Sequence, residues 1–205
     1  MTIQDAELWS TEEDCSIYLY TRGQSQRGAS FRVSYQSLYM ADCIEALHTL
    51  SSEITFDRNS PSSTSSRSST PSERPSSMYE LYLGAPQGLD RDETCRWHVT
   101  TRNFFAFLQD KALVGESLGW AMVNLAERIQ SWVGHKIDVV DEMIQYAEGL
   151  GYLDFVNHPT NSVAMLHFAE TYQVRTLWID AFAHCVGMKE SLSDIPGYDV
   201  CYQLA

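Results

Sequence analysis

The residues whose types and spacing most resemble a chemical motif are Gly115-Glu-Ser-Leu-Gly119. A serine with a glycine two positions away on each side is the pattern of a nucleophile elbow, in which small neighbours allow a tight strand-to-helix turn that exposes the serine hydroxyl. A short apolar run precedes Ser117 and a helical pattern follows it. A hydrolytic triad also needs an acid and a histidine. The downstream choices are Asp154 or Asp180 for the acid and His158 or His184 for the base, and the alternative hydrolase site is Ser117, Asp180 and His184.

Several features of the sequence favour a simpler interpretation of this motif. Trp120 is bulky where an elbow favours a small residue, and no His-Gly pair, the usual upstream oxyanion-hole motif, occurs in the chain. The run before the motif has room for a strand of only about four residues, and no repeated strand–helix units precede it. We therefore predict a glycine-containing loop that enters a helix, with Ser117 as the N-cap residue and no catalytic role.

Metal and cofactor motifs are weak in this sequence. Cys95-x-x-His98 and the pair His184-Cys185 could supply four zinc ligands, but structural zinc sites usually show two knuckles of regular spacing. Two neighbouring helical residues also point about 100° apart. No glycine-rich phosphate loop followed by Lys-Ser/Thr is present. We expect neither a metal nor a cofactor.

The elements that position these residues begin with strands. Residues 15–21 and 29–34 are rich in β-branched and aromatic types, and the glycine-containing stretch 22–28 between them predicts a hairpin. Helical spacing follows over residues 35–50, and residues 79–83 form a third short strand. Together they predict a small sheet of about three strands.

Helical patterns occupy the rest of the chain. The first two cover residues 97–108 and 118–132. The third is capped by Asp138 and ends at Gly149 or Gly151, and the fourth begins at Pro159 or Asn161. The fifth covers residues 177–185 and is closed by Gly187. Strands first and helices afterwards predict an α+β fold, with five or six helices packed on the sheet.

One stretch, residues 57–77, has no apolar side chain and is rich in serine and proline. Such a composition cannot bury a core, so we predict a disordered insert within one domain of residues 1–188, with a tail over 189–205. Ser68, near an arginine, and Thr70, before a proline, would suit protein kinases.

The charge balance excludes several classes of partner. Lys and Arg number 14 against 27 Asp and Glu in 205 residues, a net charge of −13; without the insert, which holds three arginines and two acids, the rest carries −14. This acidity disfavours nucleic acid and anionic membranes. No apolar run is long enough to span a bilayer. The N-terminal stretch is acidic, whereas a signal peptide begins with basic residues and an apolar run. The five cysteines are widely spaced, as is typical of reduced thiols. We expect a soluble intracellular protein, cytoplasmic or nuclear.

The order of these elements resembles the BTB/POZ fold. The stretch Met165-Leu-His-Phe-Ala-Glu-Thr-Tyr-Gln-Val-Arg-Thr-Leu-Trp178 is similar to the closing helix pair of that family, which commonly reads Leu, x, x, Ala-Glu, x, Tyr, x, Val/Ile, x, x, Leu. The resemblance implies self-association or the binding of partner proteins, cullin-type ubiquitin-ligase scaffolds among them.

A longer resemblance, from about Trp9 to Met188, is to an uncharacterised family of filamentous-fungal proteins. It rests on four runs: Thr101-Arg-Asn-Phe-Phe-Ala-Phe-Leu108, Leu113-Val-Gly115, Gly151-Tyr-Leu-Asp-Phe155 and Leu177-Trp-Ile-Asp-Ala-Phe-Ala-His-Cys-Val-Gly-Met188. Those proteins carry a BTB-like region followed by long low-complexity tails, whereas this sequence ends at Ala205. That family has no established activity, so the resemblance implies no catalytic residues.

These observations together predict a non-enzymatic protein–protein interaction module. Trp120 and Trp132 are candidates for the partner surface, with core packing as the alternative for each. An acidic surface favours a basic partner and salt-sensitive association.

Overall fold

The computed structural model describes residues 5–41, 47, 54–56, 79–134, 137–192 and 195–196. The chain divides into two compact units, Met1–Thr94 and Cys95–Ala205. The predicted insert with Ser68 and Thr70, the second half of the predicted helix 35–50 and most of the predicted tail lie outside the described residues. The single domain over residues 1–188 stays a prediction.

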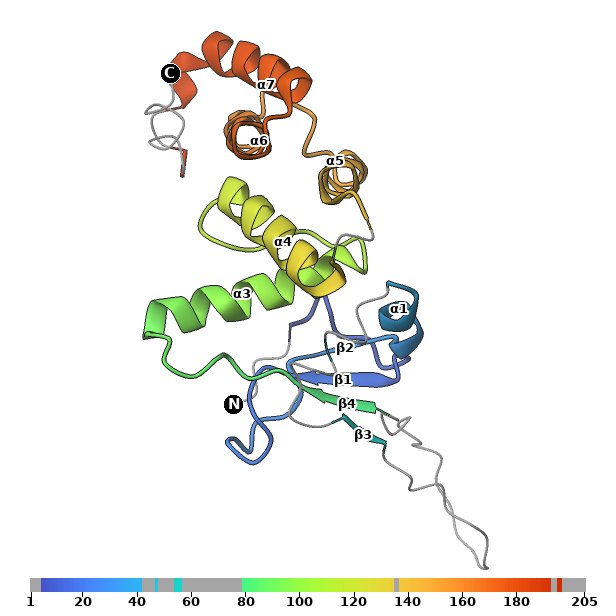
Figure 1. Cartoon of the computed structure of the whole chain (residues 1–205). Coiled ribbons are helices and arrows are strands. Elements are labelled where there is room, and N and C mark those ends of the chain that lie inside the picture. The colour runs from blue at the N-terminus through green and yellow to red at the C-terminus, as the bar shows by residue number, and fades with distance from the viewer. Residues whose placement is uncertain are drawn as a thin grey trace, which may run out of the picture. The chain divides into compact units, whose positions relative to one another are not determined.

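The first unit is built on a mixed sheet with the strand order β2-β1-β4-β3 (Figure 1). The strands are β1 Cys15–Tyr18, β2 Phe31–Val33, β3 Ile54–Phe56 and β4 Tyr79–Tyr82. β1 pairs antiparallel with β2, which confirms the predicted hairpin, and parallel with β4, which pairs antiparallel with β3. β3 was not predicted, because a three-residue strand is too short to show an alternating pattern.

Short strands of this kind are stabilised by what they bury. Ile17 of β1 and Phe31 of β2 stand opposite each other in the ladder, and both are buried. The rings of Tyr18 and Tyr82 stack at 4.4 Å across the parallel pair, and both hydroxyls donate to the Glu80 carboxylate, at 3.0 and 3.1 Å. Such aromatic cross-strand pairs supply much of the stability of a small sheet.

Helix α1, Tyr35–Met40, follows β2 directly. The Ser34 hydroxyl accepts from the Ser37 backbone N–H and caps the start of the helix. Leu38 is the buried residue of this helix.

The second unit is helical. Helix α3, Arg91–Phe107, leads into it, and α4 Leu118–Val133, α5 Val139–Gly149, α6 Pro159–Tyr172 and α7 Arg175–Gly187 follow, with a 3₁₀ turn at Lys189–Ser191. The predicted ends are confirmed: the Asp138 carboxylate accepts from the N–H groups of Val140 and Asp141, Pro159 opens α6 and Gly187 closes α7. Strands followed by helices make the fold α+β, as predicted.

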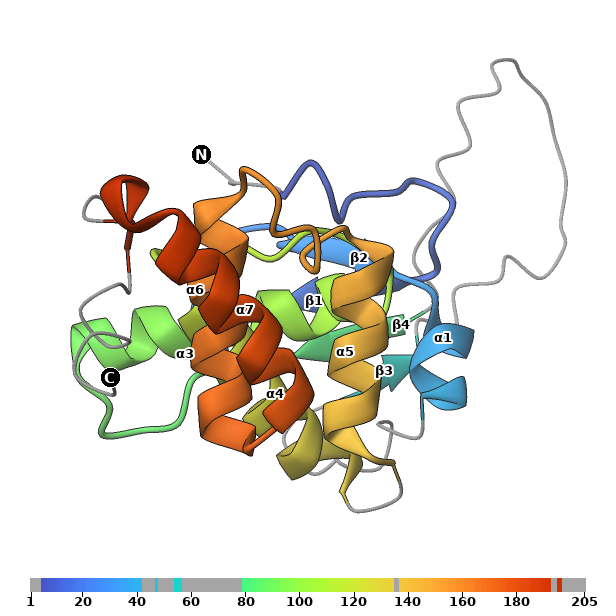
Figure 2. The same cartoon turned by 90° about the horizontal axis from the view of Figure 1, so that it is seen from above.

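Helix α6 packs against both α4 and α7 (Figures 1 and 2). The buried side chains of α4 recur at helical spacing, among them Met122, Leu125 and Ile129, and α6 contributes Met165 and Phe168. No described helix is long and apolar enough to cross a membrane.

The close approach of α4 to α6 depends on Gly119. A Cβ atom at this position would lie 2.9 Å from His167 Nδ1 and 3.2 Å from the Cα of Ala164. Real Cβ atoms essentially never show the shorter of these distances. A glycine in the first turn of α4 therefore allows the two helices to touch.

Candidate functional site

The Gly115-x-Ser117-x-Gly119 motif lies in a loop and the first turn of α4. Residues 111–117, all of them described, contain no strand. Ser117 is the N-cap residue of α4 as predicted, with extended backbone angles, but its side chain makes no capping hydrogen bond. Gly115 has φ +149°, a conformation that favours glycine. Backbone conformation at Gly115 and helix packing at Gly119 thus account for the two glycines.

The loop before the motif is bound by side chains instead of by a neighbouring strand. The contacts are Arg102 Nη1 to the Ala112 carbonyl at 2.6 Å, Asn103 Nδ2 to the Val114 carbonyl at 2.8 Å, the Val114 N–H to Asn103 Oδ1 at 3.0 Å, the Leu113 N–H to the Tyr152 hydroxyl at 3.1 Å, and the Tyr146 hydroxyl to the Lys111 carbonyl. These bonds satisfy backbone groups that a strand would pair in a sheet. The strand that a nucleophile elbow requires is therefore replaced by a loop.

The two other residues of the alternative hydrolase site lie on α7, one turn apart. Asp180 is exposed, and the His184 ring contacts the Phe155 ring with 5.5 Å between centroids. Among the hydrogen bonds and ion pairs of the described residues, none joins Ser117 to His184 or His184 to Asp180. The exposed pair Asp154 and His158 does approach, with 3.6 Å between Oδ2 and Nε2.

The two tryptophans predicted for a partner surface differ in exposure. Trp120 is 47% exposed, and its ring lies edge-on to His167 with 4.8 Å between centroids. Trp132 is 7% exposed and packs against Phe104 and the guanidinium of Arg128, so its assignment to the surface was wrong and the alternative of core packing is right. It continues the buried stripe of α4, which is the physical reason.

The cysteines and histidines of the weak zinc pattern are dispersed. Cys95 is exposed and Cys185 is buried. In the part of the chain that the structure describes, no group of three His, Cys, Asp or Glu side chains is placed to hold a metal ion.

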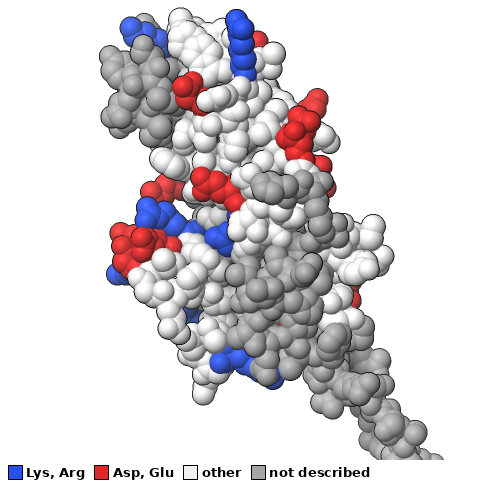
Figure 3. All heavy atoms as spheres, viewed as in Figure 1, with Lys and Arg blue, Asp and Glu red and all other residues white. Residues whose placement is uncertain are grey.

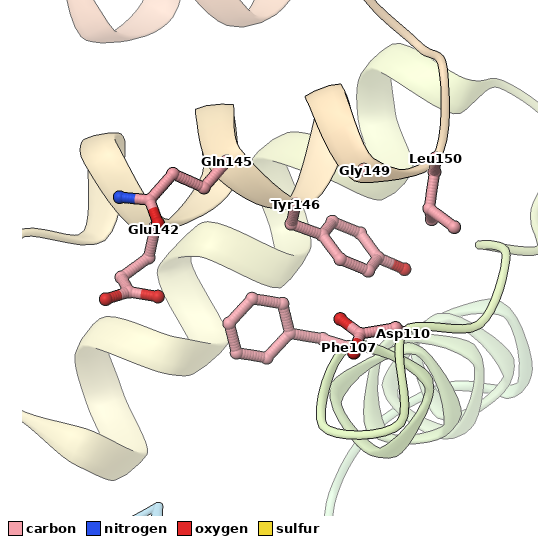
Figure 4. Close-up of a pocket in the computed structure, with 7 residues that line it drawn as sticks. All are labelled: Phe107, Asp110, Glu142, Gln145, Tyr146, Gly149 and Leu150. Carbon is pink, nitrogen blue, oxygen red and sulfur yellow. The ribbon is translucent and has the colours of Figure 1, made fainter.

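A cavity of about 540 Å³ lies between α5 and the C-terminal end of α3 (Figure 4). Its lining residues are Phe107, Asp110, Glu142, Gln145, Tyr146, Gly149 and Leu150. The rings of Phe107 and Tyr146 meet edge to face with 5.2 Å between centroids, and Tyr146 is buried. The two rings form an apolar wall that is positioned by packing.

Local structure positions the other lining groups. Asp110 follows α3 with a left-handed φ of +51°, and its N–H donates to the Phe107 carbonyl. Glu142 stands in the first turn of α5, and Gln145, Tyr146 and Gly149 recur along the same helix at three- to four-residue spacing. In Figure 4 the carboxylates of Glu142 and Asp110 lie on either side of the Phe107 ring.

The charged side chains that line the cavity, Asp110 and Glu142, are both carboxylates, and none of the described lining residues is basic. The nearby Arg102 does not line the cavity, and its charge only partly offsets the effect of burial on the pKa of Tyr146. Burial raises the pKa of Tyr146, so this phenol stays neutral at physiological pH and donates to the Lys111 carbonyl. The cavity therefore combines aromatic rings with negative charge, a combination that attracts cations.

Sequence reasoning missed this cavity. Phe107 lies within the predicted helix 97–108 and Glu142 near the start of the helix capped by Asp138, but neither was singled out as a site residue. Phe107 and Glu142 are far apart in the sequence, so the spacing of residues along the chain does not show that they line one cavity. The only local signal is the regular spacing of residues 142, 145, 146 and 149 on one face of α5.

A second cavity, of about 220 Å³, lies where α6 ends and α7 begins. It is lined by Ala169, Glu170, Gln173, Arg175 and Trp178. Its rim holds one acid and one base, so charge gives it no preference for a cation or an anion.

Helix α7 is apolar on two sides. Ala181 and Cys185 are buried, whereas Ile179 and Val186 are 49% and 60% exposed. Residues 179, 183 and 186 recur at the spacing of one helix face, and Ala183 is also exposed. We call Ile179, Ala183 and Val186 the outer stripe of α7.

The fold and these surfaces define an α+β protein with an acidic, aromatic cavity and an exposed apolar helix face. Residues 140–204 match a family model described as a domain of unknown function (DUF8004). The match includes the α5 residues of the cavity and the outer stripe of α7. No curated protein and no solved structure matches the chain.

Proposed function

We propose that this chain is a non-enzymatic protein–protein interaction module, a BTB/POZ-like adaptor or scaffold that binds a basic protein. The observation that carries the proposal is the outer stripe of α7. Ile179 and Val186 are exposed on a helix whose opposite face is already packed. Apolar side chains that recur on an exposed helix face are typical of surfaces that bind other proteins.

The order of elements supports the BTB/POZ-like part of the proposal. An antiparallel hairpin of β1 and β2 comes first, α1 follows, and β4 then pairs in parallel with β1 before the helices begin. This is the order that the sequence resemblance implies. The resemblance also implies cullin-type ubiquitin-ligase scaffolds among the partners.

Charge favours a basic partner over a second copy of the chain. Residues 95–205 hold 13 acids and 7 bases, and the whole chain carries −13, so two copies repel each other. On the face drawn in Figure 3, charged side chains occur in small separate groups with uncharged surface between them. A basic partner gains from the overall field, while the apolar surface supplies the close contact.

The experiment uses the full chain as bait in a lysate of a filamentous fungus, followed by purification of the captured protein and a direct binding measurement. We expect a basic partner whose binding is lost in the double variant Ile179→Ser/Val186→Ser and weakened by salt. Val156→Ser is the matched control, because Val156 is 62% exposed but lies outside α7.

Two results would overturn the proposal. One is a chain that light scattering shows to be a monomer at every concentration and that captures no specific protein. The other is a partner whose binding is unchanged by the double variant at the outer stripe.

A further inference from the structure

We propose that the cavity between α3 and α5 is a receptor for an arginine side chain in a basic peptide segment. The inference rests on the proposed function, because it specifies which group of a basic partner the module recognises. The lining residues of the cavity are separate from the outer stripe of α7.

The rings of Phe107 and Tyr146 form the aromatic wall of the cavity. Phe107 is half-buried and Tyr146 is buried, and their edge-to-face contact holds both rings in place. The Tyr146 hydroxyl is occupied by its bond to the Lys111 carbonyl and its ring is buried, so the half-buried Phe107 ring is the aromatic surface that a ligand can reach. A cation over such a ring is attracted by the negative charge of its face.

The carboxylates complete the site. Asp110 is exposed and Glu142 is half-buried, and neither forms an ion pair with a described residue. Figure 4 shows their carboxylates on either side of the Phe107 ring. A cation that enters between them is therefore attracted by both charges and by the ring.

Arginine satisfies these groups better than lysine. Its guanidinium is planar, so it stacks on an aromatic ring while its N–H groups bind a carboxylate in a fork. The ammonium of lysine is a compact and strongly hydrated charge that cannot do both.

The size and rim of the cavity fit a peptide segment. A volume of about 540 Å³ lies within the range of ligand pockets and leaves room for more than one side chain. Gln145 and Gly149 are exposed at the rim, where an amide can bind a peptide backbone and the glycine leaves access open.

The test is fluorescence anisotropy with the full chain and three labelled peptides of alternating glycine with arginine, lysine or glutamate. We expect the arginine peptide to bind best, the lysine peptide less well and the glutamate peptide not at all. Glu142→Gln and Asp110→Asn should each weaken arginine binding by about two- to five-fold. Phe107→Leu should weaken it by a similar factor, about two- to five-fold, through loss of the ring.

Glu148→Gln is the matched control. It removes the same charge from an exposed position on the same helix but does not line the cavity. If Glu148→Gln weakens binding as much as Glu142→Gln, the peptide responds to general charge and the inference is wrong. It is also wrong if Phe107→Leu binds normally while circular dichroism shows that the variant is folded.

The two proposals fail in different ways. A captured partner whose binding is unchanged by Asp110→Asn/Glu142→Gln overturns the arginine receptor and leaves the interaction module in place. A chain that binds the arginine peptide at the cavity, but is monomeric at every concentration and captures no specific protein, overturns the interaction module and leaves only arginine recognition by the cavity in place.

Discussion

Replacing Gly119 by alanine places a methyl group where α4 crosses α6. The new Cβ would lie 2.9 Å from His167 Nδ1, 3.3 Å from His167 Cβ and 3.2 Å from the Cα of Ala164. Carbon atoms pack best at about 3.5–4.0 Å, so all three contacts are too short. The imidazole can turn away, but the Ala164 Cα belongs to the backbone of α6. The two helices must therefore separate.

Two effects of opposite sign determine how much Gly119→Ala changes the free energy of unfolding. In an exposed helix interior, alanine is favoured over glycine by up to about 1 kcal/mol. Added volume at a packed position costs about 1–3 kcal/mol. We expect the steric cost to win and the free energy of unfolding to fall by about 1–2 kcal/mol, since one of the opposing atoms is backbone.

Urea unfolding followed by far-ultraviolet circular dichroism measures this difference. Gly187→Ala is the control, because a Cβ at the last residue of α7 meets no atom within 4 Å. We expect this control to be as stable as the wild type or slightly more stable. If Gly119→Ala is equally stable, the close approach of α4 to α6 does not require glycine and the structural account of the motif is wrong.

Four further substitutions test other contacts of the second unit. Asn103→Ala leaves the N–H and carbonyl of Val114 without their side-chain partner and should cost about 1–3 kcal/mol in unfolding free energy; an unchanged urea midpoint would contradict this. The Arg128 guanidinium lies over two tryptophan rings, and burial lowers its pKa to about 10. Arg128→Lys should therefore lower the free energy of unfolding by about 0.5–2 kcal/mol, measured by thermal unfolding. A variant as stable as the wild type would refute the cation–π account. Burial lowers the pKa of His167 in the folded protein. The stability that the neutral imidazole contributes is therefore fully present above about pH 6.5 and is lost as the pH falls through the pKa of the folded state. If a His167→Gln variant loses the same stability on acidification, this account is wrong. A fluorophosphonate probe should not label the chain, and labelling that Ser117→Ala abolishes would instead favour the hydrolase.

The two tryptophans predicted for the partner surface show what a sequence pattern can predict about burial. Trp120 and Trp132 were both candidates, and the structure exposes the first and buries the second. The helical spacing of Trp132 with Leu125 and Ile129 already pointed to the core. Trp120 lies off that stripe and is half-exposed, with its ring against His167 of α6.

Local chemistry determined the ends of elements. Asp138 accepts hydrogen bonds from the first turn of α5, Pro159 has no N–H to lose at the start of α6, and Gly187 ends α7. The β1–β2 hairpin is also local, since its strands follow each other in the chain and are joined by the glycine-containing stretch 19–30. The sequence alone therefore determined most of the element order, the α+β class and the acidic charge.

Contacts between distant residues were decided only by the tertiary structure. The parallel pairing of β1 with β4 joins residues more than sixty positions apart, and the cavity joins Phe107 and Asp110 to side chains of α5. The need for glycine at position 119 arises from a neighbour on another helix. Such features depend on which helix faces pack together. The spacing of apolar residues predicts which face of a helix is buried, but not the element against which that face packs.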